Sequence, residues 1–160
     1  MDTSKIRATY DGLADAAAAG PHQAKDEDEW STDRIVAHAI ATNQTLNRVG
    51  IELLDGRGTT YEGGTISVKP EWLDSIIEGA GDFDGLVTYL RHSYRELLAL
   101  ASRFSDDLGN RKFHGATFDG RGQILVEGDM SFSDILTTYL VKHMTDHTDQ
   151  VRSLQEPAFA

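Results

Sequence analysis

The chain contains no cysteine among its 160 residues. This absence excludes disulfide bonds, thiolate zinc sites, iron–sulfur clusters and a cysteine nucleophile. The amino terminus lacks a basic segment leading into an apolar one, so we expect no signal peptide. No apolar run approaches the roughly 20 residues that cross a bilayer. We therefore expect a cytoplasmic protein with no membrane partner.

Basic residues are scarce. Fifteen Lys and Arg stand against 26 Asp and Glu, which gives a formal net charge of −11. Such a field repels a phosphate backbone, and no local basic patch offsets it. We therefore do not expect nucleic acid to be a partner. The densest acidic run, "KDEDEW", is typical of a solvated loop.

Apolar side chains recur at helical spacing in four long segments. These predicted helices cover about residues 3–19, 32–55, 82–107 and 131–154. Ser31, Asp82 and Ser131 stand at three of their starts, where a short polar side chain caps a helix. Gly20 and Pro21 end the first. A shorter helix is predicted over residues 70–81, with Pro70 at its start.

Two connections are long. Residues 56–69 read as loop or weak strand, and residues 112–128 read as a small hairpin that turns at "DGRG". The predicted architecture is all-α: a four-helix bundle with a short extra helix and a small hairpin or irregular loop, forming a single domain over residues 1–160.

Two of the six histidines, His143 and His147, lie four residues apart on the apolar face of the last helix. That spacing stacks the two imidazoles one turn apart. A ring nitrogen removed from water needs a partner, because an unsatisfied polar group costs roughly 1–3 kcal/mol. A divalent metal would satisfy both rings. Core histidines bonded to neighbouring groups are the alternative.

His38 lies on the inward face of the second helix. Helical periodicity alone does not bring it to the other two, although a bundle permits that approach. The remaining histidines, His22, His92 and His114, are predicted at the surface.

Two segments resemble the DinB-like family, also described as YfiT-like metal-dependent enzymes. "EWSTDRIVAHAIATNQTLNR" is similar to the family's second-helix motif, and "DILTTYLVKHMTDHTDQVRSL" to its fourth-helix motif. The resemblance implies a DinB-like bundle in which His38, His143 and His147 together bind a divalent metal. It also implies a thiol-dependent S-transferase acting on small electrophiles, with the thiol supplied as a cosubstrate.

Zinc and nickel fit three imidazoles best, and iron, manganese and copper are the alternatives. Asn43, Asn47 and Tyr139 are the candidates to orient ligands or substrate, and no general base is identified. Two other functions stay open: a metal-binding stress protein without turnover, and a helical dimerisation module with core histidines. The resemblance also implies a homodimer. Four wide apolar stripes favour one as well, unless Trp72 and the short helix cover that surface within one chain.

Overall fold

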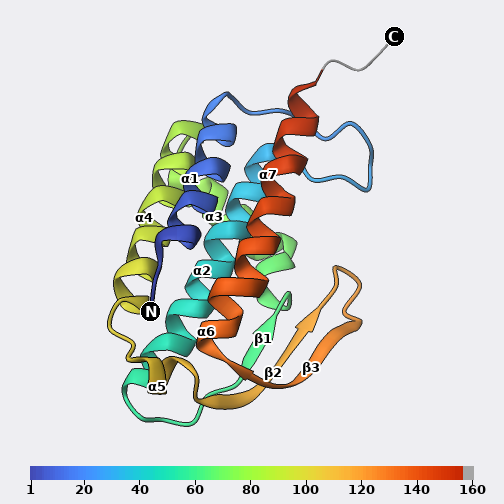
Figure 1. The fold of residues 1–160 in the computed structure, drawn as a ribbon. Coiled ribbons are helices and arrows are strands. Elements are labelled where there is room, and N and C mark those ends of the chain that lie inside the picture. The colour runs from blue at the N-terminus through green and yellow to red at the C-terminus, as the bar shows by residue number, and fades with distance from the viewer. Residues whose placement is uncertain (157–160) are drawn as a thin grey trace.

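The computed structural model describes residues 1–156. Within this range, four helical rods run side by side (Figure 1). They are α1 (Ser4–Ala18), α2 (Thr32–Leu54), α4 (Phe83–Ala101) and a C-terminal rod of α6 (Phe132–Asp134), η2 (Ile135–Leu140) and α7 (Val141–Gln155). Their apolar stripes meet in one core that includes Tyr10, Leu46, Leu90 and Leu140. The four long helical segments lie where the apolar spacing predicted them.

The predicted helix starts are correct, but the capping contacts differ. Asp82 accepts a hydrogen bond from the backbone of Gly85 at 2.7 Å, and Ser131 accepts one from the backbone of Asp134 at 3.1 Å. These bonds satisfy donors that have no partner within the helix. Ser31 stands at the N-cap of α2, yet its hydroxyl bonds the side chain of Asp33 instead.

The helix ends were predicted less well. Helix α4 ends at Ala101, and a separate short helix, α5 (Asp106–Gly109), follows it. The C-terminal rod is not regular either, because η2 is a π-helical segment between two α-helical parts. Such wide turns are rare and are often found beside functional sites.

The short helix α3 (Pro70–Ala80) lies against α2 and α4. Its inner side buries Leu73 and Ile76 in the common core. Part of the apolar surface on which the homodimer expectation rested is therefore covered within one chain.

The all-α class was wrong, because the structure contains a mixed three-stranded sheet. The predicted hairpin forms its larger part: β2 (Lys112–Phe118) pairs antiparallel with β3 (Ile124–Ser131). The third strand, β1 (Tyr61–Gly63), pairs parallel with β2 on the other side. Three residues are too few to show an alternating pattern, so β1 gave no clear signal in the sequence.

The sheet lies beside the lower part of the C-terminal rod, near α6, and β1 is followed by the 3₁₀ turn η1 (Ile66–Val68) (Figure 1). The side chain of Tyr61 is buried in the core, which anchors β1 against the bundle. The connection over residues 56–69, predicted as loop or weak strand, therefore contains β1 and η1. It passes along α2 and ends at the start of α3.

Candidate metal centre

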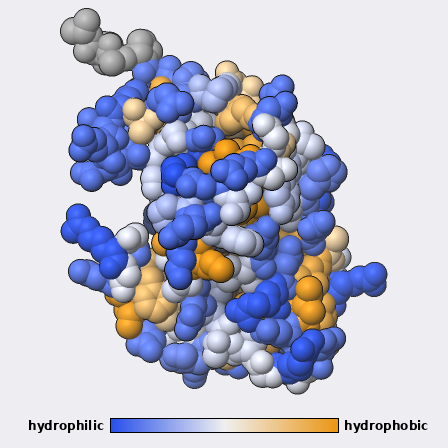
Figure 2. Space-filling view, turned by 180° about the vertical axis from the view of Figure 1, so that it is seen from behind, coloured by the Kyte–Doolittle hydropathy of each residue, from blue (hydrophilic) through white to orange (hydrophobic). Residues whose placement is uncertain are grey.

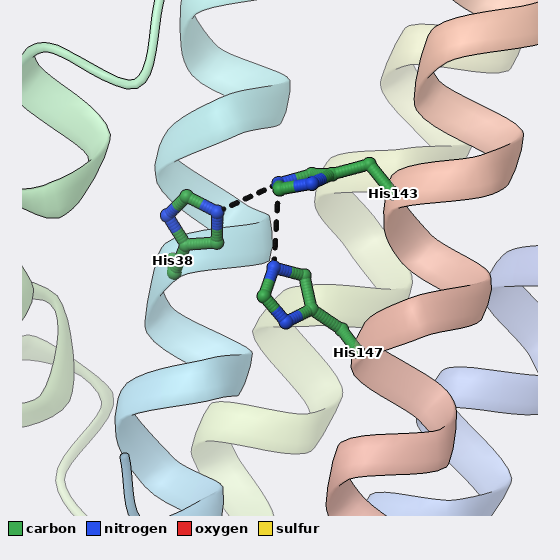
Figure 3. Close-up of side chains that lie close together, drawn as sticks. All are labelled: His38, His143 and His147. Atoms are coloured by element: carbon green, nitrogen blue, oxygen red, sulfur yellow. Dashed lines mark hydrogen bonds between the residues drawn. The ribbon is translucent and has the colours of Figure 1, made fainter. Parts of the chain in front are cut away.

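His38, His143 and His147 converge between α2 and α7 (Figure 3). The Nε2 atom of His143 lies 2.9 Å from Nε2 of His38 and 3.3 Å from Nε2 of His147. One potential ligand atom from each ring lies within 4.8 Å of the others. The group could therefore hold a metal ion.

The opposite nitrogens of two rings are bound to the protein. Nδ1 of His38 lies 2.6 Å from the backbone oxygen of Ser67, and Nδ1 of His147 lies 3.0 Å from Oε1 of Gln150. Both partners are acceptors, so each Nδ1 donates its hydrogen. In the neutral rings, Nε2 then carries a free lone pair directed into the cluster. Partners of this kind commonly orient metal-ligating histidines.

This tautomer assignment leaves an imbalance that a metal would remove. The lone pairs of His38 and His147 both face Nε2 of His143, which has at most one hydrogen to donate. A cation among the three nitrogens would bind all three lone pairs at once. Nitrogen ligands of tetrahedral zinc lie about 3.3 Å apart, given bonds of roughly 2.0–2.1 Å. The two distances from Nε2 of His143, 2.9 and 3.3 Å, are close to this value.

Burial keeps the three imidazoles uncharged. Desolvation, together with the proximity of His147 and His143, lowers the pKa of His38 to about 3. Desolvation, with His147 and Lys142 nearby, lowers the pKa of His143 to about 4. The pKa of His147 is also lowered by burial, against the opposing effects of Gln150 and Asp146. Neutral imidazole is the form that binds metal, so the three rings are in the protonation state that coordination requires.

The cluster lines one wall of a cleft of about 830 Å³. Its other walls come from the acidic loop, from η1 and from the turn of the β2–β3 hairpin, and Figure 2 shows the surface hollowed between that loop and the hairpin. Trp30, Val68, Leu125 and Tyr139 give the cleft apolar and aromatic surface. The size falls within the ~300–1,000 Å³ typical of small-molecule sites.

Tyr139, Asn43 and Asn47, the residues expected to orient ligands or substrate, lie in three different parts of the molecule. Tyr139 lies in the cleft and stacks on His143, with ring centroids 5.5 Å apart and planes 13° from parallel. Asn43 is buried elsewhere, where it accepts a hydrogen bond from Tyr10 and donates one to Ser93 at 2.9 Å. Asn47 lines a separate hollow on α2. Only Tyr139 is brought to the histidines.

The other histidines and the neighbouring acids lie outside the cluster. His92 and His114 are exposed and His22 is half-buried. Asp146 pairs with Lys142 at 2.5 Å, and Asp149 pairs with Arg152 at 3.7 Å. Within residues 1–156, the group that could hold a metal consists of the three histidines alone.

Sequence reasoning missed several neighbours of the site. Gln150 follows His147 by three residues on the same helix, and that spacing could have identified it. Trp30 packs edge-on against His38, with ring centroids 5.1 Å apart. Ser67 contacts His38 through its backbone oxygen, which every residue type has, so the residue type gives no signal for this contact.

Comparisons with protein-family models, with curated proteins and with solved structures found no match. The DinB-like resemblance therefore stays a prediction from the two motifs. In residues 1–156, no helix combines the length and apolar character needed to span a bilayer.

Proposed function

We propose that this chain is a DinB-like, divalent-metal-dependent enzyme that transfers a low-molecular-weight thiol to a small electrophile. The observation that carries the proposal is the position of three neutral imidazoles on the wall of an open cleft. A structural metal site closes with a fourth protein ligand, whereas a catalytic one keeps positions free for water or substrate. A site that only sequesters metal has no need of an adjoining cleft.

His38, His143 and His147 would hold the metal, with zinc or nickel as the best-suited ions. When bound, such an ion would supply Lewis acidity, which favours the deprotonated form of a thiol or polarises a carbonyl acceptor. The thiol has to come from solution, because the chain has no cysteine.

The chain's own residues would orient the reactants. Ser67 and Gln150 fix two of the imidazole rings, and Tyr139 supports the third by stacking. The apolar walls offered by Trp30 and Leu125 suit the carbon skeleton of an electrophile. Burial raises the pKa of Tyr139, so its hydroxyl stays protonated near neutral pH and can donate a hydrogen bond in the cleft.

The test combines metal content with turnover. Protein purified without an affinity tag is analysed for bound metals, then assayed with mycothiol, bacillithiol and glutathione against monochlorobimane. We expect about one metal per chain and faster conjugation than thiol alone in at least one pairing. His143→Ala should lose both the metal and the rate enhancement, while the control His92→Ala, a change at an exposed histidine, should keep both.

Two outcomes would contradict the proposal. Metal-replete protein that is no faster than the free thiol in every pairing would favour a metal-binding protein without turnover. Protein that binds no added zinc or nickel would favour a helical module whose histidines serve only the core.

A further inference from the structure

A second hollow lies between the sheet and the π-helical segment η2. It has a volume of about 380 Å³, within the ~300–1,000 Å³ typical of small-molecule sites. Ile135 and Thr138 of η2 line one side, and residues of β2 and β3 line the other. Tyr61 and Tyr139 line both this hollow and the histidine cleft, so the two spaces adjoin at these tyrosines. This second space, the sheet hollow, has no part in the proposed reaction.

Glycines keep the floor of the sheet hollow open. Gly115 of β2 lies opposite Gly128 of β3, on the same face of the sheet as the pair formed by Thr117 and Val126. Met130 fills the space over Gly115, since a Cβ built there would lie 2.5 Å from its Sδ atom. At Gly128, which has φ +148 and lines the hollow, a Cβ would meet no atom within 4 Å. The sheet therefore offers bare backbone to this part of the hollow.

Thr117 brings an unused hydroxyl to the sheet hollow. The residue is 3% exposed, and its Oγ1 atom has no hydrogen-bond partner within residues 1–156. Buried polar atoms nearly always have a partner, because removing one from water without a replacement bond is unfavourable. A hydroxyl can both donate and accept. A bound molecule with a polar group would supply the missing partner.

The charges around the sheet hollow favour a cation. Glu127, Asp129 and Asp134 line it, and no Lys or Arg of residues 1–156 does. Asp134 is paired with Lys112 at 2.8 Å, whereas Asp129 forms no ion pair within the described chain. Glu127 and Asp129 alternate with Gly128 on β3, so their side chains point to the other face of the strand. They therefore act through their electrostatic field, which attracts a positive group and repels a negative one.

We propose that the sheet hollow binds a small primary amine with an apolar body, held as the protonated ammonium ion. The ammonium group donates a hydrogen bond to Oγ1 of Thr117, and the rings of Tyr61 and Tyr139 attract it through cation–π interaction. The apolar body packs on Val126 and Ile135, which line the hollow from β3 and from η2. This site requires neither the metal nor the proposed transfer reaction.

The test uses chelator-treated protein, so that an amine has no metal ion to coordinate. 2-Phenylethylamine is titrated into isotopically labelled protein at pH 7 while the methyl NMR signals are followed. The signals of Val126 and Ile135 should shift to saturation, while those of Val68, which lines the histidine cleft, should not shift.

Two ligands of similar size test the charge preference. 2-Phenylethanol and 3-phenylpropionate replace the ammonium group by a hydroxyl and by a carboxylate. We expect the affinity to fall in the order amine, alcohol, carboxylate. The carboxylate should bind about 10-fold or more weakly than the amine, because the field of the acidic residues repels it.

Thr117→Val keeps the shape of the side chain and removes the hydroxyl. This variant should bind 2-phenylethylamine roughly 10-fold more weakly, since it loses a charge-assisted hydrogen bond. Its stability to urea should not fall, because the hydroxyl has no partner to lose in the free protein. Thr148→Val is the matched control: Thr148 is also buried, but its hydroxyl donates to the backbone oxygen of Met144 at 2.8 Å. That change should lower stability and leave the affinity for the amine unchanged.

The proposal would be overturned if 2-phenylethylamine shifted no methyl signal, if the shifts were confined to Val68, or if the carboxylate bound as tightly as the amine. Undiminished binding of the amine by Thr117→Val would also overturn it. These measurements contain neither metal nor thiol, so their outcome is separate from that of the transferase assay.

Discussion

At the scale of single residues, the centre depends on which nitrogen of each imidazole carries hydrogen. Ser67 and Gln150 place that hydrogen on Nδ1 of His38 and His147, which directs the two Nε2 lone pairs into the cluster. A histidine held by neither partner would populate the other tautomer and turn a donor toward the metal position.

Gln150→Ala should therefore weaken metal binding about 10- to 100-fold, the usual cost of losing such a partner. The dissociation constant is measured by competition with a chelator. Gln150→Glu keeps an acceptor for the Nδ1 hydrogen and should bind metal at least as tightly as wild type.

The matched control is Gln155→Ala, on the same helix. Its side chain donates to the backbone oxygen of Ala16 at 2.6 Å, so this change should lower stability and leave metal affinity within about two-fold. Equal affinity losses in Gln150→Ala and Gln155→Ala would show that Gln150 acts through packing alone.

Residue types and helical spacing predicted the three histidines and their neighbour Tyr139, but not the other groups around them. His143 and His147 followed from a four-residue interval, and His38 from its phase on α2, with the family motif joining them. The contact of Ser67 could not be predicted, because a backbone oxygen is the same in every residue type. Asn43 was predicted near the site, yet its phase on α2 directs it to Tyr10 and Ser93.

At the scale of elements, β1 is held against β2 by a glycine that no other residue can replace. Gly64 has φ +85, and a Cβ there would lie 2.3 Å from the backbone oxygen of Phe118. Both the left-handed backbone and the close approach to β2 exclude a side chain.

Gly64→Ala should therefore destabilise the protein by more than the ~1–2 kcal/mol that the left-handed conformation alone costs. Gly56→Ala is the control: φ is +71 there, but nothing lies within 4 Å of an added Cβ. Urea denaturation of both variants separates the two contributions. Equal losses of stability would mean that the β1–β2 contact adapts to the methyl group.

The long helices were predictable because each repeats its apolar pattern over several turns. Strand β1 was not, since it has three residues and its partner β2 begins only after the turn η1 and three further α-helices. The π-helical segment η2 was also missed, because its apolar residues fit the α-helical period nearly as well.

At the scale of the whole molecule, the histidines make stability depend on pH. In the unfolded chain they titrate near 6.5, whereas burial lowers the pKa of His38 to about 3 and that of His143 to about 4. Between these values the unfolded chain binds more protons. The free energy of unfolding should thus fall as pH falls below 6.5, by up to about 1.4 kcal/mol per pH unit for each histidine.

Urea denaturation of chelator-treated protein between pH 7 and 5 checks this dependence. His38→Gln removes one titrating ring and should reduce the slope, while His92→Gln, at the surface, should not. Metal-loaded protein should be more stable at pH 7 and lose that advantage as protons displace the ion. A slope unchanged in His38→Gln would contradict the assignment.

The parallel pairing of β1 with β2 also bears on the order in which the protein folds. Residue 61 pairs with residue 115, and His38 meets His143 across 105 residues, so both contacts close long loops. Long loops are entropically costly to close, and contacts of high sequence separation slow folding. The bundle helices can form from local contacts, but the three imidazoles meet only when α7 docks. During synthesis the three histidines therefore come together only once α7 has left the ribosome.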